Sequence, residues 1–147
     1  MLNDFSPSSC DHQRAGDPAS FRGDVRRATL PPVADTVCRL SQQLAARAFQ
    51  VEVGDLRRPS RCRANIALAR QAAMYLANVA GEVTFTDVAR RFGRDRSTVS
   101  HACGLIEDLR DDAGMDAAID LLSDALRASC RMNDLRQRVG RRFTSIR

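Results

Sequence analysis

Lysine is absent from this chain, and all 23 of its basic residues are arginine. Arginine binds phosphate and guanine through forked hydrogen bonds, although a lysine-free chain fits a GC-rich genome equally well. The phosphate-binding loop G-x-x-x-x-G-K-[ST] needs its lysine, so no nucleotide site of that kind is expected. A nucleophile elbow and a paired metal motif are also missing from the sequence. We therefore expect neither an enzyme nor a cofactor.

Cysteine is present but scattered, and the five residues form no C-x-x-C pair: Cys10, Cys38, Cys62, Cys103 and Cys130. An odd, scattered set does not make a disulfide framework. Cys38 and Cys103 fall within apolar patterns, which favours small core residues. The pairs Cys10-x-His12 and His101-x-Cys103 offer two ligands each, whereas structural zinc binds four. We expect no metal site.

Long apolar runs are missing as well, so no membrane span is expected. The N-terminus lacks the apolar stretch of a secretory signal and carries Asp4 and Asp11 early. Together with the cysteine pattern, this predicts a reduced, cytoplasmic protein.

Charge, by contrast, is abundant and segregated along the chain. Residues 55–101 carry nine arginines against four acids, whereas residues 105–126 carry one arginine against seven acids. Residues 127–147 are basic again, with seven arginines against one acid. A basic block is typical of a surface that meets a polyanion, and the acidic block must point elsewhere.

The length of 147 residues fits one domain with tails. Residues 1–32 combine proline, serine and glycine without a hydrophobic period, which predicts a flexible tail. Residues 33–139 are predicted to form the domain, and residues 140–147 a short basic tail. The fold class that we expect is all-α, with about five or six helices.

Hydrophobic spacing of three and four residues places the longer helices at residues 35–49, 65–80 and 115–139. The second of these is apolar on more than one face and should be the central core helix. Residues 51–56 are expected to form a turn. Residues 57–63 hold four arginines around a proline, which predicts a basic loop rather than a helix.

The most informative pattern lies between these elements, in residues 84–109. Thr84 followed by Asp87 resembles a capping box and predicts a short helix that ends near Phe92. Gly93 permits the left-handed backbone conformation that ends such a helix. A second helix must therefore begin just after this glycine.

Either Asp95 or Ser97 can cap the second helix. Its apolar residues recur at helical spacing and predict one buried stripe: Val99, Ala102, Ile106 and Leu109. Its first turn stays outside that stripe and is polar and basic: Arg94, Asp95, Arg96, Ser97, Thr98 and Ser100. A packed helix with such an exposed first turn is typical of the recognition helix of a helix-turn-helix.

Residues 92–103 read FGRDRSTVSHAC, and this stretch resembles the DNA-binding C-terminal domain of the bacterial replication initiator DnaA. That family carries a signature close to FGGRDHTTVLHAC. The resemblance continues through residues 69–74 and 106–110 and covers roughly residues 35–127. One glycine of the signature is missing here, and Arg96 stands where the family has histidine.

The resemblance implies binding of double-stranded DNA by a helix-turn-helix. In the family, a helix in the position of residues 35–49 joins this domain to an ATPase module. This sequence has no ATPase phosphate loop, so the resemblance implies the DNA-binding domain standing alone. In the family a loop arginine also enters the minor groove, and its position here is Cys62, so the role falls to Arg61 or Arg63. The resemblance also implies that Arg70 and Gln71 face phosphate.

The residue types of the two helices predict how they contact DNA. Arg94, together with Arg90 or Arg91, should neutralise phosphates. The first turn of the second helix should enter the major groove with Asp95, Arg96, Ser97 and Thr98.

There Asp95 can accept from a cytosine amino group, Arg96 can fork onto a guanine, and the Thr98 methyl can touch a thymine methyl. Asp95 fits the role of helix cap equally well. His101 completes the candidate DNA-binding set, and we expect it to be partly buried.

Three functions fit these patterns. The first is modulation of chromosomal replication initiation by binding sites like the initiator's boxes. The second is transcription regulation at a drifted operator. The third is a protein-interaction module whose acidic helix holds a replication protein. A monomer is expected, because no long heptad seam is visible.

Overall fold

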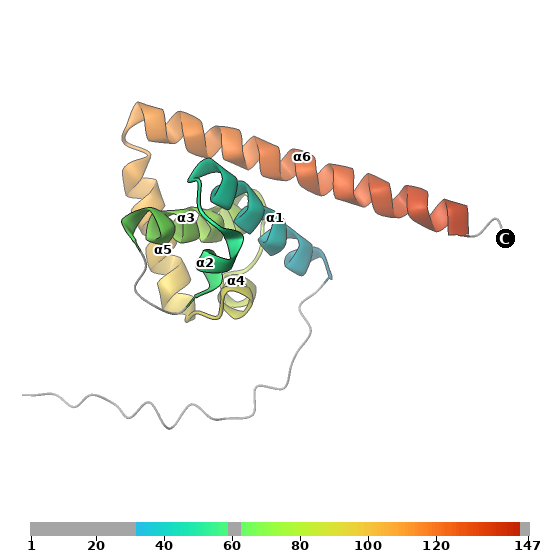
Figure 1. The fold of residues 1–147 in the computed structure, drawn as a ribbon, viewed down its shortest axis with the longest axis horizontal. Helices are drawn as coiled ribbons and strands as arrows, with labels where there is room; N and C mark the ends of the chain where they lie inside the picture. Colours follow the sequence, from blue (N-terminus) through green and yellow to red (C-terminus); the bar gives the residue numbers. More distant parts are fainter. Residues whose placement is uncertain (1–31, 59–62, 145–147) are drawn as a thin grey trace, which may run out of the picture.

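A computed structural model describes residues 32–58 and 63–144 of the chain, and within them every regular element is helical (Figure 1). The predicted all-α fold is confirmed. The elements follow one another as α1 (Pro32–Ala48), α2 (Val53–Arg57), α3 (Ala64–Tyr75), the π-helical turn η1 (Leu76–Ala80), α4 (Phe85–Phe92), α5 (Arg96–Leu109) and α6 (Ala113–Thr144). No helix among these residues combines the length and apolar character that crossing a bilayer requires.

Helix α3 is the central core helix, as its apolar pattern predicts. Its buried side chains are Ala69, Ala72, Ala73, Met74 and Tyr75. It packs most extensively against α1 and α5. Because the distance between packed helices depends on the side chains at the contact, the three alanines let both neighbours approach closely.

A π-helical turn continues α3, where the sequence predicts a regular helix to Ala80. The amide of Gly81 donates to the carbonyl of Leu76 at 3.0 Å, and the amide of Val83 to that of Ala77 at 3.1 Å. The wider turn brings Gly81 against α1: a Cβ there would overlap Val37 Cγ1 and would lie 2.8 Å from the Ala77 carbonyl oxygen. Glycine is therefore required at this position by close packing.

Two local expectations need correction. Residues 51–56 are not a turn throughout, because α2 occupies Val53–Arg57. Leu56 in this helix is fully buried beside Ala46 and Ala69, and burial of its side chain stabilises a helix too short to form alone. Helix α1 begins at Pro32, earlier than Asp35, since proline is tolerated in the first turn.

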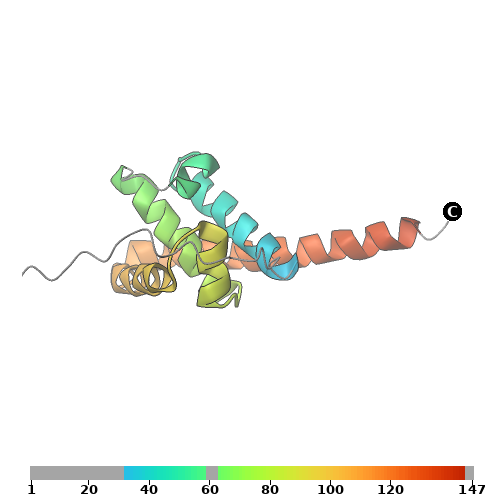
Figure 2. The same ribbon diagram turned by 90° about the horizontal axis from the view of Figure 1, so that it is seen from below.

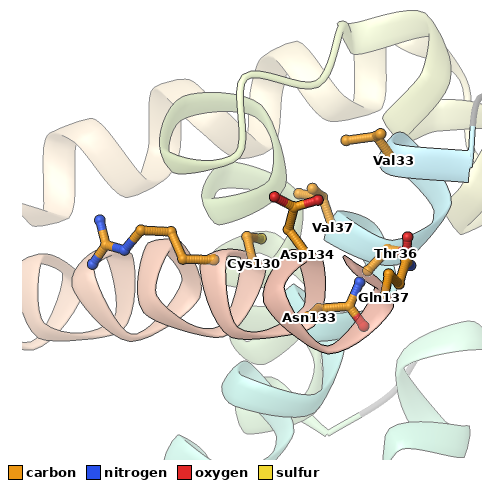
Figure 3. A pocket seen from close by; sticks show the side chains of 8 residues that line it. Val33, Thr36, Val37, Cys130, Asn133, Asp134 and Gln137 are labelled. Carbon is orange, nitrogen blue, oxygen red and sulfur yellow. The ribbon is translucent and has the colours of Figure 1, made fainter. Parts of the chain in front are cut away.

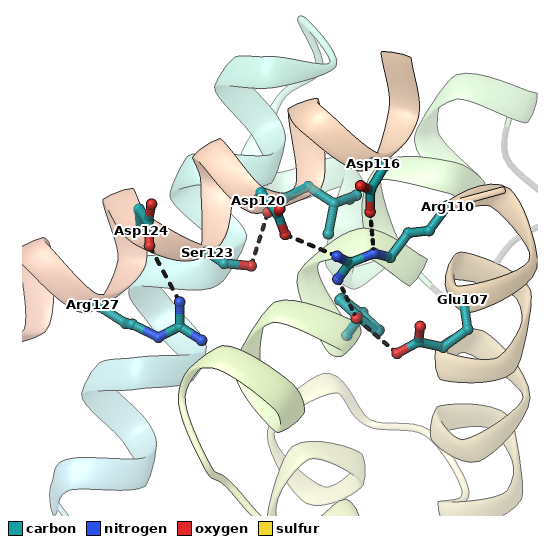
Figure 4. A network of polar contacts seen from close by, with 9 residues as sticks. Glu107, Arg110, Asp116, Asp120, Ser123, Asp124 and Arg127 are labelled. Carbon is teal, nitrogen blue, oxygen red and sulfur yellow. Dashed lines mark hydrogen bonds and ion pairs between the residues drawn. The ribbon is translucent and has the colours of Figure 1, made fainter. Parts of the chain in front are cut away.

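A polar network fastens the start of α6 to the core (Figure 4). Arg110, which follows α5, lies 2.7 Å from Asp116 and 2.9 Å from Asp120. Its Nη1 donates to the Tyr75 hydroxyl at 2.9 Å, and that hydroxyl donates to Glu107 at 2.7 Å. Burial, together with the hydrogen bond to Glu107, raises the pKa of Tyr75, so its proton is retained.

Helix α6 runs for 32 residues. It packs on the core from its start, and its residues 130–137 still line a groove with α1. Ile119 and Leu126 of this helix are fully buried. The C-terminal end of α6 extends past the rest of the molecule (Figures 1 and 2). The final helix was predicted from the sequence, and it continues to Thr144, into the segment that its composition marked as a tail.

Candidate nucleic-acid interface

Helices α4 and α5 form the predicted helix-turn-helix. The Thr84 hydroxyl oxygen accepts from the Asp87 amide at 3.2 Å and caps α4. Gly93 ends α4 in the left-handed conformation, with φ of 62°. The Arg94 amide then closes the turn by donating to the Ala89 carbonyl at 2.9 Å. Each of these signals is local, which is why the sequence predicts them.

Helix α5 buries one face and exposes the start of the other. Val99, Ala102 and Ile106 are buried against the core, as their spacing predicts. The side chains of its first turn are exposed: Asp95, Arg96, Ser97, Thr98 and Ser100. This end of α5 lies on the opposite side of the core from α6 (Figure 1). The molecule thus presents a polar helix start to a partner.

Asp95 occupies the cap position of α5, but its carboxylate makes no capping hydrogen bond. Only its backbone takes part in the helix, through the carbonyl that accepts from Val99 at 3.3 Å. Ser97 lies inside the helix and not at its cap. Of the two roles considered for the Asp95 side chain, contact with a partner fits this geometry better than capping.

Arg96 is exposed and rests over a neighbouring aromatic ring. Its guanidinium carbon lies 5.8 Å from the centroid of Phe85, the first residue of α4. A cation over a ring face gains about 0.5–1 kcal/mol at an exposed site. The contact holds the guanidinium at the edge of the helix-turn-helix without using its hydrogen-bond donors.

The two arginines that end α4 differ in their surroundings. Arg90 is exposed and pairs with Asp87 within its own helix, at 3.1 Å. The buried Nε of Arg91 instead lies 3.1 Å from Asp35 of α1, a charge pair without the alignment of a hydrogen bond. Of the alternatives Arg90 and Arg91, the geometry favours Arg90 for contact with a ligand.

Arg70 ties α2 to α3. Its Nε donates to the Leu56 carbonyl at 2.8 Å, and its Nη2 donates to the carbonyls of Asp55 and Arg58 at 3.0 and 3.2 Å. Carbonyls at the end of a helix lack partners within it, and a cation there is favourable. These bonds give Arg70 a structural task that its place in the sequence does not show.

The basic loop begins beside the helix-turn-helix. Arg94 donates to the Arg58 carbonyl at 2.8 Å, which joins the turn of the helix-turn-helix to the end of α2. Arg63, on the far side of the loop, is exposed at the start of α3. Arg61 lies outside the described residues. The bond between Arg94 and Arg58 therefore joins the end of α2 to the turn before α5, and Arg63 lies at the start of the next helix, α3.

His101 and Cys103 lie on different faces of α5. His101 is exposed, so the expectation of partial burial is wrong; it lies one turn beyond Ser97 and Thr98 and continues their exposed face. Cys103 is buried, and burial raises the pKa of its thiol to about 11. Burial likewise raises the pKa of Cys38 to about 12. Both thiols stay protonated at neutral pH and serve as core residues.

Comparison with known proteins identifies the same segment. Residues 41–106 match the family described as bacterial dnaA protein helix-turn-helix. The chromosomal replication initiator protein DnaA of Desulfotalea psychrophila is 39% identical over 89 residues, which are 60% of this chain and 18% of that protein. DnaA 2 of Chlamydia trachomatis is 40% identical over 77 residues, which are 52% of this chain and 17% of that protein. The chain thus spans less than a fifth of the length of these relatives.

Proposed function

We propose that this protein binds double-stranded DNA at sites like the initiator's boxes and thereby modulates chromosomal replication initiation, because residues 41–106 match the bacterial DnaA helix-turn-helix family. The observation that carries the proposal is the first turn of α5, which is polar, basic and exposed while the opposite face of the helix is buried. A recognition helix needs both features, since one face must be held rigidly while the other meets base edges.

In the proposed complex, Asp95, Arg96, Ser97 and Thr98 enter the major groove. Arg96 forks onto a guanine, Asp95 accepts from a cytosine amino group, and the Thr98 methyl contacts a thymine methyl. The exposed His101 lies one turn further along the same face and reaches the groove edge. The Asp95 carboxylate is exposed and makes no capping hydrogen bond, so it is available for such a contact.

Arg90 and Arg94 neutralise phosphates on either side of the turn, which fixes the register without reading sequence. Arg63, or Arg61 beside it, reaches the neighbouring minor groove, where the negative potential attracts arginine. The bond between Arg94 and the Arg58 carbonyl supports this arrangement, because it couples the loop to the helix-turn-helix. Arg70 supports this interface indirectly, through its hydrogen bonds to the carbonyls at the end of α2.

The test is fluorescence anisotropy of the purified chain on a duplex that carries an initiator box, against a scrambled duplex of equal length, at physiological salt. We expect a preference of about a hundredfold or more for the box. Arg96→Ala should reduce this preference by about tenfold or more, because a forked contact to guanine favours the correct base by about 1–3 kcal/mol. Arg141→Ala is the matched control, since it removes one exposed arginine from the far end of α6.

Equal and steeply salt-dependent binding to both duplexes would contradict initiator-box recognition. It would instead favour the second function, transcription regulation at another operator, which the arginine at the family's histidine position supports. Absence of binding at low salt would overturn both DNA functions and leave the interaction module.

A further inference from the structure

Helix α6 carries an exposed apolar stripe that the proposed DNA interface does not use. Leu121, Met132, Leu135 and Val139 are 71%, 65%, 55% and 44% exposed. They account for most of the large apolar side chains that the described residues leave in solvent. Large apolar side chains gathered along one helix mark a surface for a partner.

The stripe has the spacing of a coiled coil. With Ala125 and Ala128, these residues follow one another at alternating steps of four and three from position 121 to position 139. We call these six residues the α6 seam. The seam lies on the opposite side of the helix from Ile119, Ser123 and Leu126, which face the core and are buried. A second helix can therefore lie along the seam without displacing the domain.

Charge along α6 points to the kind of partner. Residues 113–126 of the helix carry three acids and no arginine, whereas residues 127–144 carry six arginines and one acid. A second α6 laid antiparallel sets each acidic half against a basic half. A parallel α6 sets like charges together along the whole length, which is unfavourable.

We propose that α6 pairs with α6 of a second copy of this chain as an antiparallel coiled coil through the α6 seam. In the register that aligns the two seams, Leu121 faces Val139 of the second copy, Ala125 faces Leu135, and Ala128 faces Met132. Each alanine thus meets a large side chain, so the layers fill evenly. A parallel pair would place Ala125 against Ala125 and Ala128 against Ala128, which leaves voids.

The polar flank of the seam fits the same register. Asp124 and Arg138 both lie beside the seam and come together between the two copies, twice by symmetry. Arg131 lies near the two-fold axis and faces Arg131 of the second copy. This is the one unfavourable charge contact of the pair. In a parallel pair Arg131 would meet Arg136 of the second copy, again twice.

This self-association goes beyond the proposed DNA binding and replaces the expectation of a monomer. Helix α6 and the first turn of α5 lie on opposite sides of the core (Figure 1). Each copy therefore keeps its DNA-binding face clear when the two α6 helices pair. Failure of one proposal leaves the other intact, because the two use different faces and different measurements.

Sedimentation equilibrium of the full chain tests the pairing. We expect a dimer with a dissociation constant of about 1–100 μM, in keeping with a seam of six residues of which two are alanine. Leu135→Glu should weaken it by about a hundredfold, because a carboxylate would be buried against Ala125 of the second copy. A monomer at all concentrations up to about 100 μM would overturn the proposal.

Val33→Glu is the matched control. Val33 is 74% exposed, more than Leu135, and lies in a groove of about 380 Å³ between α1 and α6, with Cys130 and Gln137 (Figure 3). It is not part of the α6 seam, so the dimer should persist in this variant. A dimer that survives Leu135→Glu but dissociates in Val33→Glu would overturn the proposed interface.

A charge exchange tests the orientation. Asp124→Arg and Arg138→Asp should each weaken the dimer, since each sets like charges together between the copies. The double variant should restore it, because the exchanged pair again attracts. Both residues also pair within their own helix, Asp124 with Arg127 and Arg138 with Asp134, and the double exchange repairs neither of those contacts. A double variant weaker than both single variants would overturn the antiparallel arrangement.

Discussion

Arg91 and Arg96 lie close together in the chain but face different parts of the molecule. Arg91 turns inward to Asp35 of α1, and its side chain is 26% exposed. Arg96 stays in solvent over Phe85. An arginine held by a carboxylate of the fold stabilises the protein, whereas one with its donors in solvent can bind phosphate or a base edge. The surroundings of each arginine, and not its residue type, decide which of these it does.

This distinction predicts opposite effects for Arg90→Ala and Arg91→Ala. Arg91→Ala should lower the free energy of unfolding by about 1 kcal/mol, because the α1–α4 charge pair is lost, and should leave DNA affinity unchanged. Arg90→Ala should leave stability nearly unchanged and reduce the salt dependence of DNA binding by about one phosphate contact. Urea denaturation and anisotropy titrations separate the two. Equal losses of affinity would place both arginines at the DNA.

The buried thiols predict a loss of stability in alkaline solution. The Cys38 thiol ionises near pH 12 in the folded chain and near pH 9.0 when exposed. Below about pH 9 both states keep the proton, so this contribution to stability is complete; above it, ionisation favours the unfolded chain until the folded pKa is passed. The free energy of unfolding should therefore fall from about pH 9 upward, and less steeply in Cys38→Ala. A flat profile up to pH 11 would contradict the burial of this thiol.

Among the helical elements, η1 depends most on a single residue. Gly81→Ala should destabilise the protein by about 1–3 kcal/mol, since its Cβ would overlap Val37 of α1 and crowd the Ala77 carbonyl. Gly104→Ala, in α5, is the control: nothing lies within 4 Å of a Cβ there, and alanine favours the helix by up to about 1 kcal/mol. Urea denaturation of the two variants should give changes of opposite sign. Equal changes in the free energy of unfolding would mean that η1 adjusts to the added methyl group at little cost.

The docking of α6 depends on Tyr75, a fully buried residue of α3. Tyr75→Phe keeps the ring but removes the hydroxyl that bonds Glu107 and Arg110, at a cost of about 1 kcal/mol. Hydrogen exchange in the first turns of α6 should become faster, because Arg110 also holds Asp116 and Asp120 there. Exchange in α4, which makes none of these contacts, serves as the internal control. Unchanged protection in α6 would show that its apolar contacts suffice.

The elements differ in how far the sequence predicts them. The helix-turn-helix could be predicted because its signals are local, a cap at Thr84 and a left-handed glycine at Gly93. Helix α2 could not, since five residues carry no period and its carbonyls are held by Arg70, far along the chain. The π-helical turn also depends on a distant contact, the approach of α1 to Gly81. The choice between Arg90 and Arg91 likewise needed the packing of α1 against α4.

At the scale of the whole molecule, segments of different charge along the sequence lie on different faces of the fold. The start of α5 lies on one side of the core and α6 lies on the other (Figure 1), and both carry exposed arginines. The acids that begin α6 pair with Arg110 and do not approach the start of α5. Among the described residues, we therefore expect a DNA duplex bound at α5 to meet the first set of arginines and not those of α6.

The salt dependence of DNA binding tests this arrangement. The logarithm of affinity falls with the logarithm of salt concentration with a slope of about −0.9 for each phosphate neutralised. Arg90→Ala with Arg94→Ala should reduce the slope by about two units, whereas Arg136→Ala with Arg141→Ala, which removes the same charge from α6, should leave it unchanged. Anisotropy titrations between about 50 and 200 mM salt resolve such a difference. Equal slopes for the two double variants would mean that α6 also lies against the DNA backbone, and the two faces would then not be independent.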